Sequence, residues 1–242
     1  RGGWQSLWTV LGASSLLFLA LVWWAGRTVH EQPTDPRPRP GRRPLRSLLS
    51  AGLLLAVMFG FYSLQYAAVS GFLPVALGQL HRVSPADAGW LTALVMMSNA
   101  LGNIIGGILQ HRAFPGARSL LVGTLGMLLS ALAVFLVPLP LPLTVALFVT
   151  FALFGGLVPS TILSLVPRAA PADGLGRLNG LINQAVQIGS LVGPPLVGFG
   201  AAASHGWPGA LWVLVPANLA AVAVALAVGR SLARPDEETQ TS

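Results

Sequence analysis

The sequence predicts an all-α integral membrane protein, and three observations support this class. Apolar residues make up 54% and charged residues only 9% of the 242 residues, whereas an ordinary soluble domain has roughly 25% charged residues. The sequence contains seven apolar runs, each long enough to cross a hydrocarbon core of roughly 30 Å. Arginines gather between these runs, where basic residues set the orientation of membrane helices.

The first apolar run, residues 4–26, is followed by residues 27–46, the only long polar segment. Pro and Arg alternate there, which makes the segment extended, solvated and unable to form a core. We therefore expect a cytoplasmic linker; a binding site for anionic lipid headgroups is the less favoured interpretation. Because the chain starts at Arg1 without an initiator Met and enters the first run within a few positions, we also expect a fragment.

The remaining six runs are expected to form one transmembrane bundle over residues 47–232, followed by a cytoplasmic tail, residues 233–242. The six runs lie at residues 48–78, 88–110, 118–138, 141–166, 175–201 and 208–230. Residues 138–142 read Pro-Leu-Pro-Leu-Pro, which favours a tight hairpin between two helices over one continuous helix.

The six expected helices can be divided into two triplets. A Gly-x-x-Pro pattern occurs late in the first member of each triplet, from Gly71 to Pro74 and from Gly156 to Pro159. Because these two members cross in opposite directions, the patterns lie near opposite membrane faces, as in transporters built from inverted repeats with interrupted helices. The sequence therefore predicts two inverted three-helix repeats, with a helix break at each pattern.

The arginines predict the orientation. With residues 27–46 in the cytoplasm, only Arg1 and Arg82 of the 14 arginines lie outside. This bias predicts an external N-terminus and a cytoplasmic C-terminus in the cell (plasma or inner) membrane. The tryptophans fall near the expected helix ends and are interpreted as an interfacial aromatic belt.

Amide and tyrosine side chains are concentrated in three of the six helices, often four residues apart, a spacing that places them on one helix face. Amides that face hydrocarbon are costly, so they either line a polar cavity or bridge neighbouring helices. Both interpretations remain open. The candidate substrate-binding residues are Tyr62, Gln65, Tyr66, Asn99, Asn103, Asn183 and Gln187. The third helix of each triplet has few polar residues and is expected to face lipid.

Glycines and prolines mark positions at which helices are expected to pack closely or bend. Two loop arginines are added because they are able to contact helix ends or lipid phosphates. The candidate gating and packing residues are Gly71, Pro74, Gly102, Gly106, Gly107, Arg112, Arg118, Pro159, Gly189, Gly193, Pro194 and Pro195.

The arrangement resembles the sixth to twelfth helices of the major facilitator superfamily. Residues 179–195, which end in Gly-Pro-Pro, look like the eleventh helix of that family. Residues 102–118 look like a degenerate copy of its loop signature, with His111 in place of the usual aspartate and with Phe114 and Pro115 as extra residues. A charge-relay gate is therefore not expected in this loop. Residues 71–90 are similar to the cyanate and nitroimidazole transporter branch.

The resemblance implies that residues 1–26 are the last helix of an N-terminal bundle that this sequence lacks. It also implies a secondary active transporter that moves a small organic solute or anion by alternating access. The implied partners are the lipid bilayer, the small-molecule substrate and the N-terminal bundle, with no cofactor. A permease subunit driven by a separate ATPase is the alternative left open.

Enzyme and nucleic-acid functions are disfavoured by the placement of charge. All seven acidic residues and all four histidines fall in expected loops, tails or helix ends, and no His-Glu-x-x-His zinc motif or glycine-rich phosphate loop is present in the sequence. Cysteine is absent, so no thiolate metal site is expected. The net charge of +7 is explained by membrane orientation. None of the runs from 48 to 230 holds a carboxylate or histidine away from its ends, so any proton-coupling site is expected in the N-terminal bundle that this sequence lacks.

Overall fold

The computed structural model describes residues 4–28, 45–169 and 174–233. The chain forms two compact units, residues 1–42 and 43–242. In the described residues there are seven helices long and apolar enough to cross a membrane, and no strand. The predicted all-α membrane class is therefore confirmed.

The first unit contains α1, Trp4–Thr28. Hydroxyl groups on this helix bond to carbonyl oxygens of the same helix: Ser15 Oγ donates to Leu11 O at 2.8 Å. Such bonds satisfy polar side chains without a partner helix. Near its end, the Arg27 guanidinium lies 3.6 Å from the centre of the Trp23 ring, a cation–π contact. Most of the expected linker, residues 29–44, lies outside the described residues, so the linker stays a prediction.

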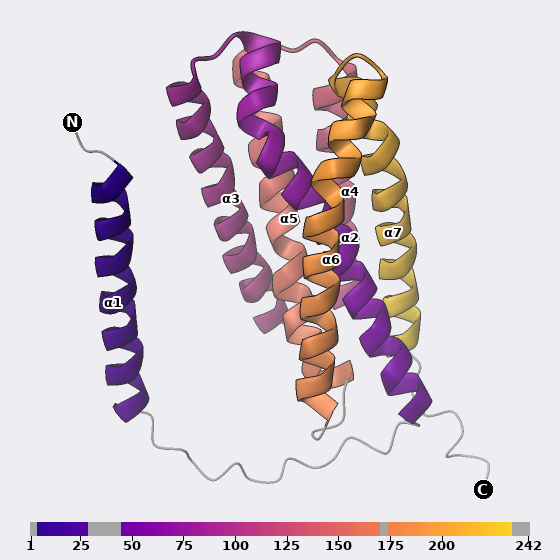
Figure 1. Ribbon diagram of the computed structural model, residues 1–242. Coiled ribbons are helices and arrows are strands. Elements are labelled where there is room, and N and C mark those ends of the chain that lie inside the picture. Colours follow the sequence, from indigo (N-terminus) through magenta and orange to yellow (C-terminus); the bar gives the residue numbers. More distant parts are fainter. Residues whose placement is uncertain (1–3, 29–44, 170–173, 234–242) are drawn as a thin grey trace, which may run out of the picture. The chain divides into compact units, whose positions relative to one another are not determined.

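The second unit is a bundle of six long helices whose neighbours in sequence run in opposite directions (Figure 1). The helices are α2 Leu45–His81, α3 Pro85–His111, α4 Gly116–Leu136, α5 Leu141–Ala169, α6 Leu175–Ala203 and α7 Leu211–Ala233, with the short 3-10 helix η2 Trp207–Ala210 before α7. The hairpin expected at residues 138–142 is present, because α4 ends at Leu136 and α5 begins at Leu141. The expected tail from residue 234 onward lies outside the described residues.

The predicted helix breaks are wrong. Pro74 lies inside α2 and Pro159 inside α5, and both helices continue past the Gly-x-x-Pro patterns without interruption. An internal proline removes one backbone hydrogen bond, but an irregular segment at membrane depth would leave several backbone groups unpaired. The helices therefore continue through these prolines, as α6 does through Pro194 and Pro195.

The packing of the helices follows the division into two triplets, α2 to α4 and α5 to α7. The first helix of each triplet packs along the second helix of the other, α2 on α6 and α5 on α3. In Figure 1, α2 crosses obliquely behind α6. The third helix of each triplet likewise packs on the first helix of the other triplet, α4 on α5 and α7 on α2. Equivalent helices thus have equivalent neighbours, as expected for two inverted repeats.

The third helices are not the most exposed helices of the second unit, and that they face lipid stays a prediction. In the most apolar stretch of each helix, 50% of α4 and 39% of α7 is buried, compared with 22% of α3 and 22% of α6. The reason is that α4 and α7 pack on each other as well as on α5 and α2. By contrast, α3 and α6 make no extended contact with each other, so both keep broad exposed faces.

Trp207 is a core residue and not part of an interfacial belt. It is 9% exposed, and its indole Nε1 donates a hydrogen bond to Gln79 Oε1 at 2.9 Å. Its ring lies 5.9 Å from the Phe72 ring and 6.4 Å from the Phe135 ring, centre to centre. The belt interpretation missed this role because η2 turns the indole inward. Trp212, five residues later, is 79% exposed.

Candidate substrate-binding face

Asn99 lies at the centre of a hydrogen-bond network that joins α2, α3 and α5. Its Nδ2 donates to the Tyr62 hydroxyl at 3.1 Å and to the Ala152 carbonyl oxygen at 3.0 Å. Its Oδ1 accepts a bond from Asn103 Nδ2 at 3.2 Å. Every polar atom of the Asn99 side chain therefore has a partner, and this amide bridges helices.

Two tyrosines of α2 stack next to this network. The Tyr62 and Tyr66 rings lie 5.6 Å apart, centre to centre, with 12° between their planes. Tyr62 is buried and also contacts the Phe59 ring at 5.8 Å. Tyr66 is only half-buried. The stack therefore ends at Tyr66 on the exposed side of the bundle.

Gln65 is the one substrate-binding candidate of α2 that takes no part in the Asn99 network or the tyrosine stack, because it faces α7 instead. It is 1% exposed, as is Asn218 of α7, whose Nδ2 donates to Gln65 Oε1 at 2.7 Å. Gln65 Nε2 donates to the Phe61 carbonyl oxygen at 3.0 Å. Of the two interpretations left open by the sequence, the structure favours helix bridging for Gln65. Asn218 was not a candidate, although a lone amide in an apolar helix is a signal that a partner exists.

Asn183 and Gln187 of α6 both have exposed side chains. Asn183 Nδ2 donates to the Asn179 carbonyl oxygen at 3.1 Å, whereas Gln187 has no hydrogen-bond partner among the described residues. Neither amide bridges α6 to another described helix. Both therefore present polar atoms on the exposed surface of α6.

Direct contacts place Asn99 and Gln187 at about the same level along α2. Tyr62 of α2 is bonded to Asn99, and its neighbour Ser63 bonds to α6. The Ser63 hydroxyl donates to the Val186 carbonyl oxygen at 2.9 Å and lies 2.6 Å from the Ser190 hydroxyl. Gln187 lies between these two α6 residues in sequence, so α3 and α6 carry amides at matching depth on the two sides of α2.

We refer to Tyr66, Asn103, Asn183 and Gln187 as the polar face. Asn103 and Asn183 are each one helical turn from Asn99 and Gln187, and in both cases toward the end of the bundle where α3 stops and α6 starts. Tyr66 is one helical turn from Tyr62 in the opposite direction, toward the end of α2. The polar face therefore extends over several helical turns along three helices and is not a single compact site. Tyr62 and Asn99, which are bonded to each other, lie next to the α2 and α3 residues of this face and pack against them.

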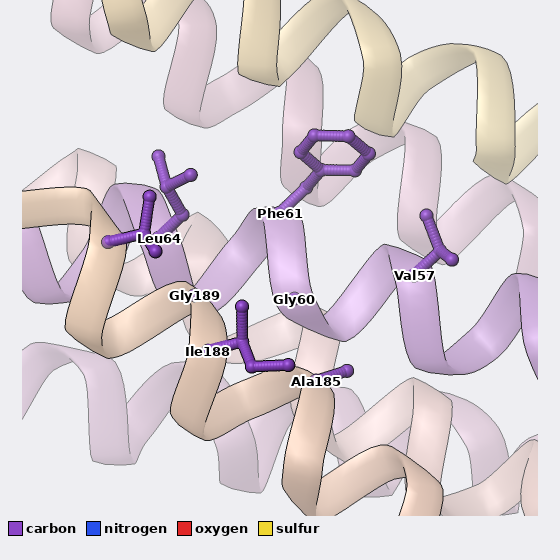
Figure 2. Close-up of a pocket in the computed structure, with 8 residues that line it drawn as sticks. Val57, Gly60, Phe61, Leu64, Ala185, Ile188 and Gly189 are labelled. Atoms are coloured by element: carbon purple, nitrogen blue, oxygen red, sulfur yellow. The ribbon is translucent and has the colours of Figure 1, made fainter. Parts of the chain in front are cut away.

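An apolar groove lies on the other side of the contact between α2 and α6 (Figure 2). Its volume is about 260 Å³, and its lining includes Phe61 and Leu64 of α2 and Ile188 and Val192 of α6. Successive helix residues are about 100° apart, so Phe61 points away from Tyr62 and Tyr66, and Ile188 points away from Asn183. The α2–α6 pair thus separates an apolar side, suited to lipid, from a polar side.

Four of the candidate glycines lie where two helix backbones approach closely. A Cβ on Gly102 would meet the Leu153 carbonyl oxygen of α5, and one on Gly193 would meet the Leu64 carbonyl oxygen of α2. Gly106 and Gly189 are equally crowded, by Ser160 of α5 and Gly60 of α2 respectively. Any side chain at these positions would push the paired helices apart.

Two candidate glycines and the two candidate arginines show no close packing. A Cβ on Gly71 or Gly107 would meet nothing within 4 Å, so close packing does not account for these two glycines. Arg112 is the C-cap of α3 and Arg118 lies in the first turn of α4, and both are exposed. A role for any of these residues in gating stays a prediction.

No charged side chain of the described residues belongs to the polar face. Charged side chains in the described helices lie near helix ends, for example Asp87 in the first turn of α3 and Arg177 in the first turns of α6. The described residues also contain no group of three or more His, Cys, Asp or Glu placed to hold a metal ion. The chemistry that the face offers is hydrogen bonding by amides and stacking on an aromatic ring.

The described helices are long and apolar enough to cross a membrane and carry a polar face. The family model described as Major Facilitator Superfamily matches residues 1–194 and, in a second match, residues 55–242. The chain belongs to the major facilitator superfamily. The family resemblance seen in the sequence is therefore confirmed, while the cyanate and nitroimidazole branch stays a prediction.

Similar proteins include transporters of two kinds. The "Probable nitrate/nitrite transporter NarK2" of Mycobacterium tuberculosis (strain ATCC 25618 / H37Rv) is 31% identical over 165 residues, which are 68% of this chain and 40% of that protein. The "Enterobactin exporter EntS" of Shigella flexneri is 35% identical over 168 residues, 67% of this chain and 40% of that protein. The alignments thus cover about 40% of the length of these relatives.

Proposed function

We propose that this chain is part of a secondary active transporter that moves a small organic solute or anion by alternating access. One observation carries the proposal: Gln187 exposes an amide group at the depth of the part-buried Asn99 network, and Asn183 exposes another amide one helical turn away. Amides at that depth are costly in hydrocarbon. Water, a solute or another polar protein surface must therefore cover them, as on a transport path.

The relatives support transport of a small solute but do not agree on which one. One is named for nitrate and nitrite and another for enterobactin, so similarity of about 31 to 35% does not identify the cargo. The partners that we propose are the lipid bilayer, the solute and a further helix bundle that covers the polar face. An ATPase-driven permease has no observation in its favour here.

We further propose that the protein lies in the cell (plasma or inner) membrane, with the α3–α4 loop and the C-terminus in the cytoplasm. The arginines support this orientation, since Arg112 and Arg118 flank that loop whereas Arg82 is the only arginine in the loops at the opposite end of the bundle. The crowded glycines of α3 and α6 would then act as fixed contacts about which the helix pairs move.

Transport is tested with membrane vesicles that contain the full protein to which this chain belongs. Secondary transport predicts that solute accumulation stops when an ionophore collapses the ion gradients and continues when ATP is removed. Accumulation that requires ATP, together with an ATPase that co-purifies in detergent, would instead establish the permease alternative.

The position of the path is tested separately by single cysteines, since the sequence has no native cysteine. Gln187→Cys on the polar face is expected to react with a membrane-impermeant maleimide. Val192→Cys, on the same helix but in the apolar groove, is the matched control and is expected to remain unlabelled. Equal labelling of both, or of neither, would contradict the assignment of the polar face to the path.

A further inference from the structure

Two arginines come together at the end of the bundle where α4 begins and α7 ends. Arg118 lies in the first turn of α4, and Arg230 lies in the last turn of α7. The residues that precede them are in close contact, because a Cβ on Gly229 would lie 3.0 Å from the Ala117 Cβ. With a rise of about 1.5 Å per residue, the backbones of the two arginines differ in depth by only about 3 Å.

Both arginines point to the same side of the α4–α7 pair. The two helices pack on each other and run in opposite directions (Figure 1). Ala117 and Gly229 face each other, and the residue that follows each of them is rotated by about 100° around its helix. In antiparallel helices these two rotations lead to one side of the pair. Both arginine side chains are exposed there, so this side faces away from the bundle core.

The charges of the two arginines are not compensated within the described part of the chain. Neither side chain makes a hydrogen bond or an ion pair to a described residue. Asp87, the only acidic side chain described in the second unit, lies at the start of α3 and so at the opposite end of the bundle. Two like charges this close repel each other. An anion between them removes the repulsion, and phosphate oxygens suit guanidinium groups, which donate paired hydrogen bonds.

The surface that continues from each arginine toward the middle of its helix is apolar. Exposed apolar side chains follow at intervals of three, four or seven residues, which keeps them on the face of the arginine: Val122, Leu125 and Leu129 in α4, and Leu226 and Leu219 in α7. The 21 residues of α4 span about 32 Å, close to the thickness of a hydrocarbon core. Arg118 therefore lies at the level of lipid headgroups, and the apolar residues lie at the level of acyl chains.

We propose that Arg118 and Arg230 together bind the phosphate of an anionic phospholipid whose acyl chains lie along the exposed apolar residues of α4 and α7. The headgroup supplies the negative charge that the described residues lack at this end of the bundle. The apolar surface below the arginines favours a lipid over free phosphate. The bound lipid relieves the repulsion beside the Ala117–Gly229 contact and so stabilises the packing of α4 on α7. Neither arginine belongs to the polar face, so this site is separate from the proposed transport path.

The test measures which lipid is enriched beside Arg118. In the full protein to which this chain belongs, with any other cysteine replaced, Val122→Cys carries a bimane fluorophore one turn from Arg118. The protein is reconstituted in phosphatidylcholine vesicles with a trace of phosphatidylglycerol or phosphatidylcholine that has a quenching nitroxide on its acyl chain near the headgroup. One basic residue contributes a factor of about 5 to the binding of anionic lipid. We therefore expect phosphatidylglycerol to quench about 5- to 25-fold more effectively than phosphatidylcholine.

Variants separate the arginine pair from the general positive charge at this end of the bundle. Arg118→Gln and Arg230→Gln are each expected to lower the preference for phosphatidylglycerol by about 2- to 5-fold, and the double variant to bring it to about one. Arg177→Gln is the matched control, because Arg177 is also exposed but lies at the start of α6, and it should leave the preference unchanged. Thermal melting of each variant shows that it is folded.

A free phosphate ion is distinguished from a lipid by competition. Inorganic phosphate in excess, compared with chloride at equal ionic strength, is expected not to reduce quenching by labelled phosphatidylglycerol. Displacement by phosphate would overturn the assignment to a lipid. A preference of about one in the unaltered protein, a preference that persists in the double variant, or an equal loss in Arg177→Gln would overturn the site itself. None of these outcomes bears on transport, which the accumulation assay tests separately.

Discussion

The buried amide pair shows how a single polar residue is accommodated within the bundle. Gln65 and Asn218 are bonded to each other at 2.7 Å, but Asn218 Oδ1 is buried and has no partner among the described residues. A buried polar atom without a partner costs free energy. The pair therefore holds α2 against α7 while retaining one unfavourable feature.

The first prediction concerns this pair. Gln65→Met would leave the whole Asn218 amide without a partner, so we expect it to lower the free energy of unfolding by about 0.6 to 2 kcal/mol. The double variant Gln65→Met/Asn218→Leu removes both polar groups and should recover most of that loss. Equilibrium unfolding in detergent of the unaltered protein, Gln65→Met, Asn218→Leu and the double variant completes a double-mutant cycle.

The control for the amide pair is Gln187→Met, which replaces an exposed amide without a described partner. Its unfolding free energy should stay within about 0.5 kcal/mol of the unaltered protein. Additive losses from Gln65→Met and Asn218→Leu in the double variant would contradict the assignment of Gln65 to a helix bridge.

The second prediction concerns Asp87, the only acidic side chain in the described part of the second unit. Its backbone N–H donates to Ser84 Oγ at 3.2 Å, and the Ser84 hydroxyl donates to Asp87 Oδ2 at 2.7 Å. This reciprocal arrangement caps the N-terminus of α3. We therefore expect Asp87→Asn to leave the pH dependence of uptake unchanged, and Ser84→Ala to lower stability by about 0.5 to 2 kcal/mol.

Uptake measured against pH for Asp87→Asn decides between capping and coupling. A displaced pH profile would show that Asp87 is a coupling carboxylate. Asp173, the other acidic residue expected between α5 and α6, lies outside the described residues, and its independence from coupling stays a prediction.

At the scale of the helix, the contact between α3 and α5 depends on the absence of side chains. Gly102 faces backbone atoms of Leu153 and Gly156, which cannot move aside as a flexible side chain can. Gly107 lies on the same helix, and a Cβ there would meet nothing within 4 Å. The two glycines therefore form a matched pair for testing close packing.

The third prediction is that Gly102→Leu destabilises the bundle by more than about 2 kcal/mol, because the added side chain must separate α3 from α5. Gly107→Leu adds the same apolar volume to the same helix and should change stability by less than about 0.5 kcal/mol. Thermal melting in detergent compares them. Similar melting temperatures for the two variants would show that the backbones are not in close contact at Gly102.

The helices were predictable because length and hydropathy alone select membrane spans. Every end of the six long helices lies within three residues of its expected position. The continuity of α2 through Pro74 and of α5 through Pro159 was not predictable in the same way, because whether a proline interrupts a helix depends on neighbours that satisfy the freed groups.

The polar residues were predictable as a group but not one by one. A spacing of four correctly placed Tyr62 with Tyr66 and Asn99 with Asn103 on shared faces. Gln65 differs from Tyr66 by one position, or about 100° around the helix, and this rotation turns it toward α7. Which neighbour a face meets depends on helix packing, which residue spacing does not encode.

At the scale of the whole molecule, the membrane topology links the helices to the transport function. The α3–α4 loop and the α4–α5 loop are separated by one helix, α4, that is long enough to cross the membrane. The two loops must therefore lie on opposite sides whichever way the bundle is inserted. The arginines predict which side each loop takes.

The fourth prediction uses the lack of native cysteine. His111 at the end of α3 and Pro138 in the α4–α5 loop are both exposed, so a cysteine at either position is accessible to reagent. In intact cells, we expect a membrane-impermeant maleimide to label Pro138→Cys at once and His111→Cys only after the membrane is permeabilised. The reversed pattern would contradict the orientation but keep the helix count, because α4 would still separate the loops. Labelling of both from outside would mean that α4 does not span, and the two inverted triplets would no longer hold.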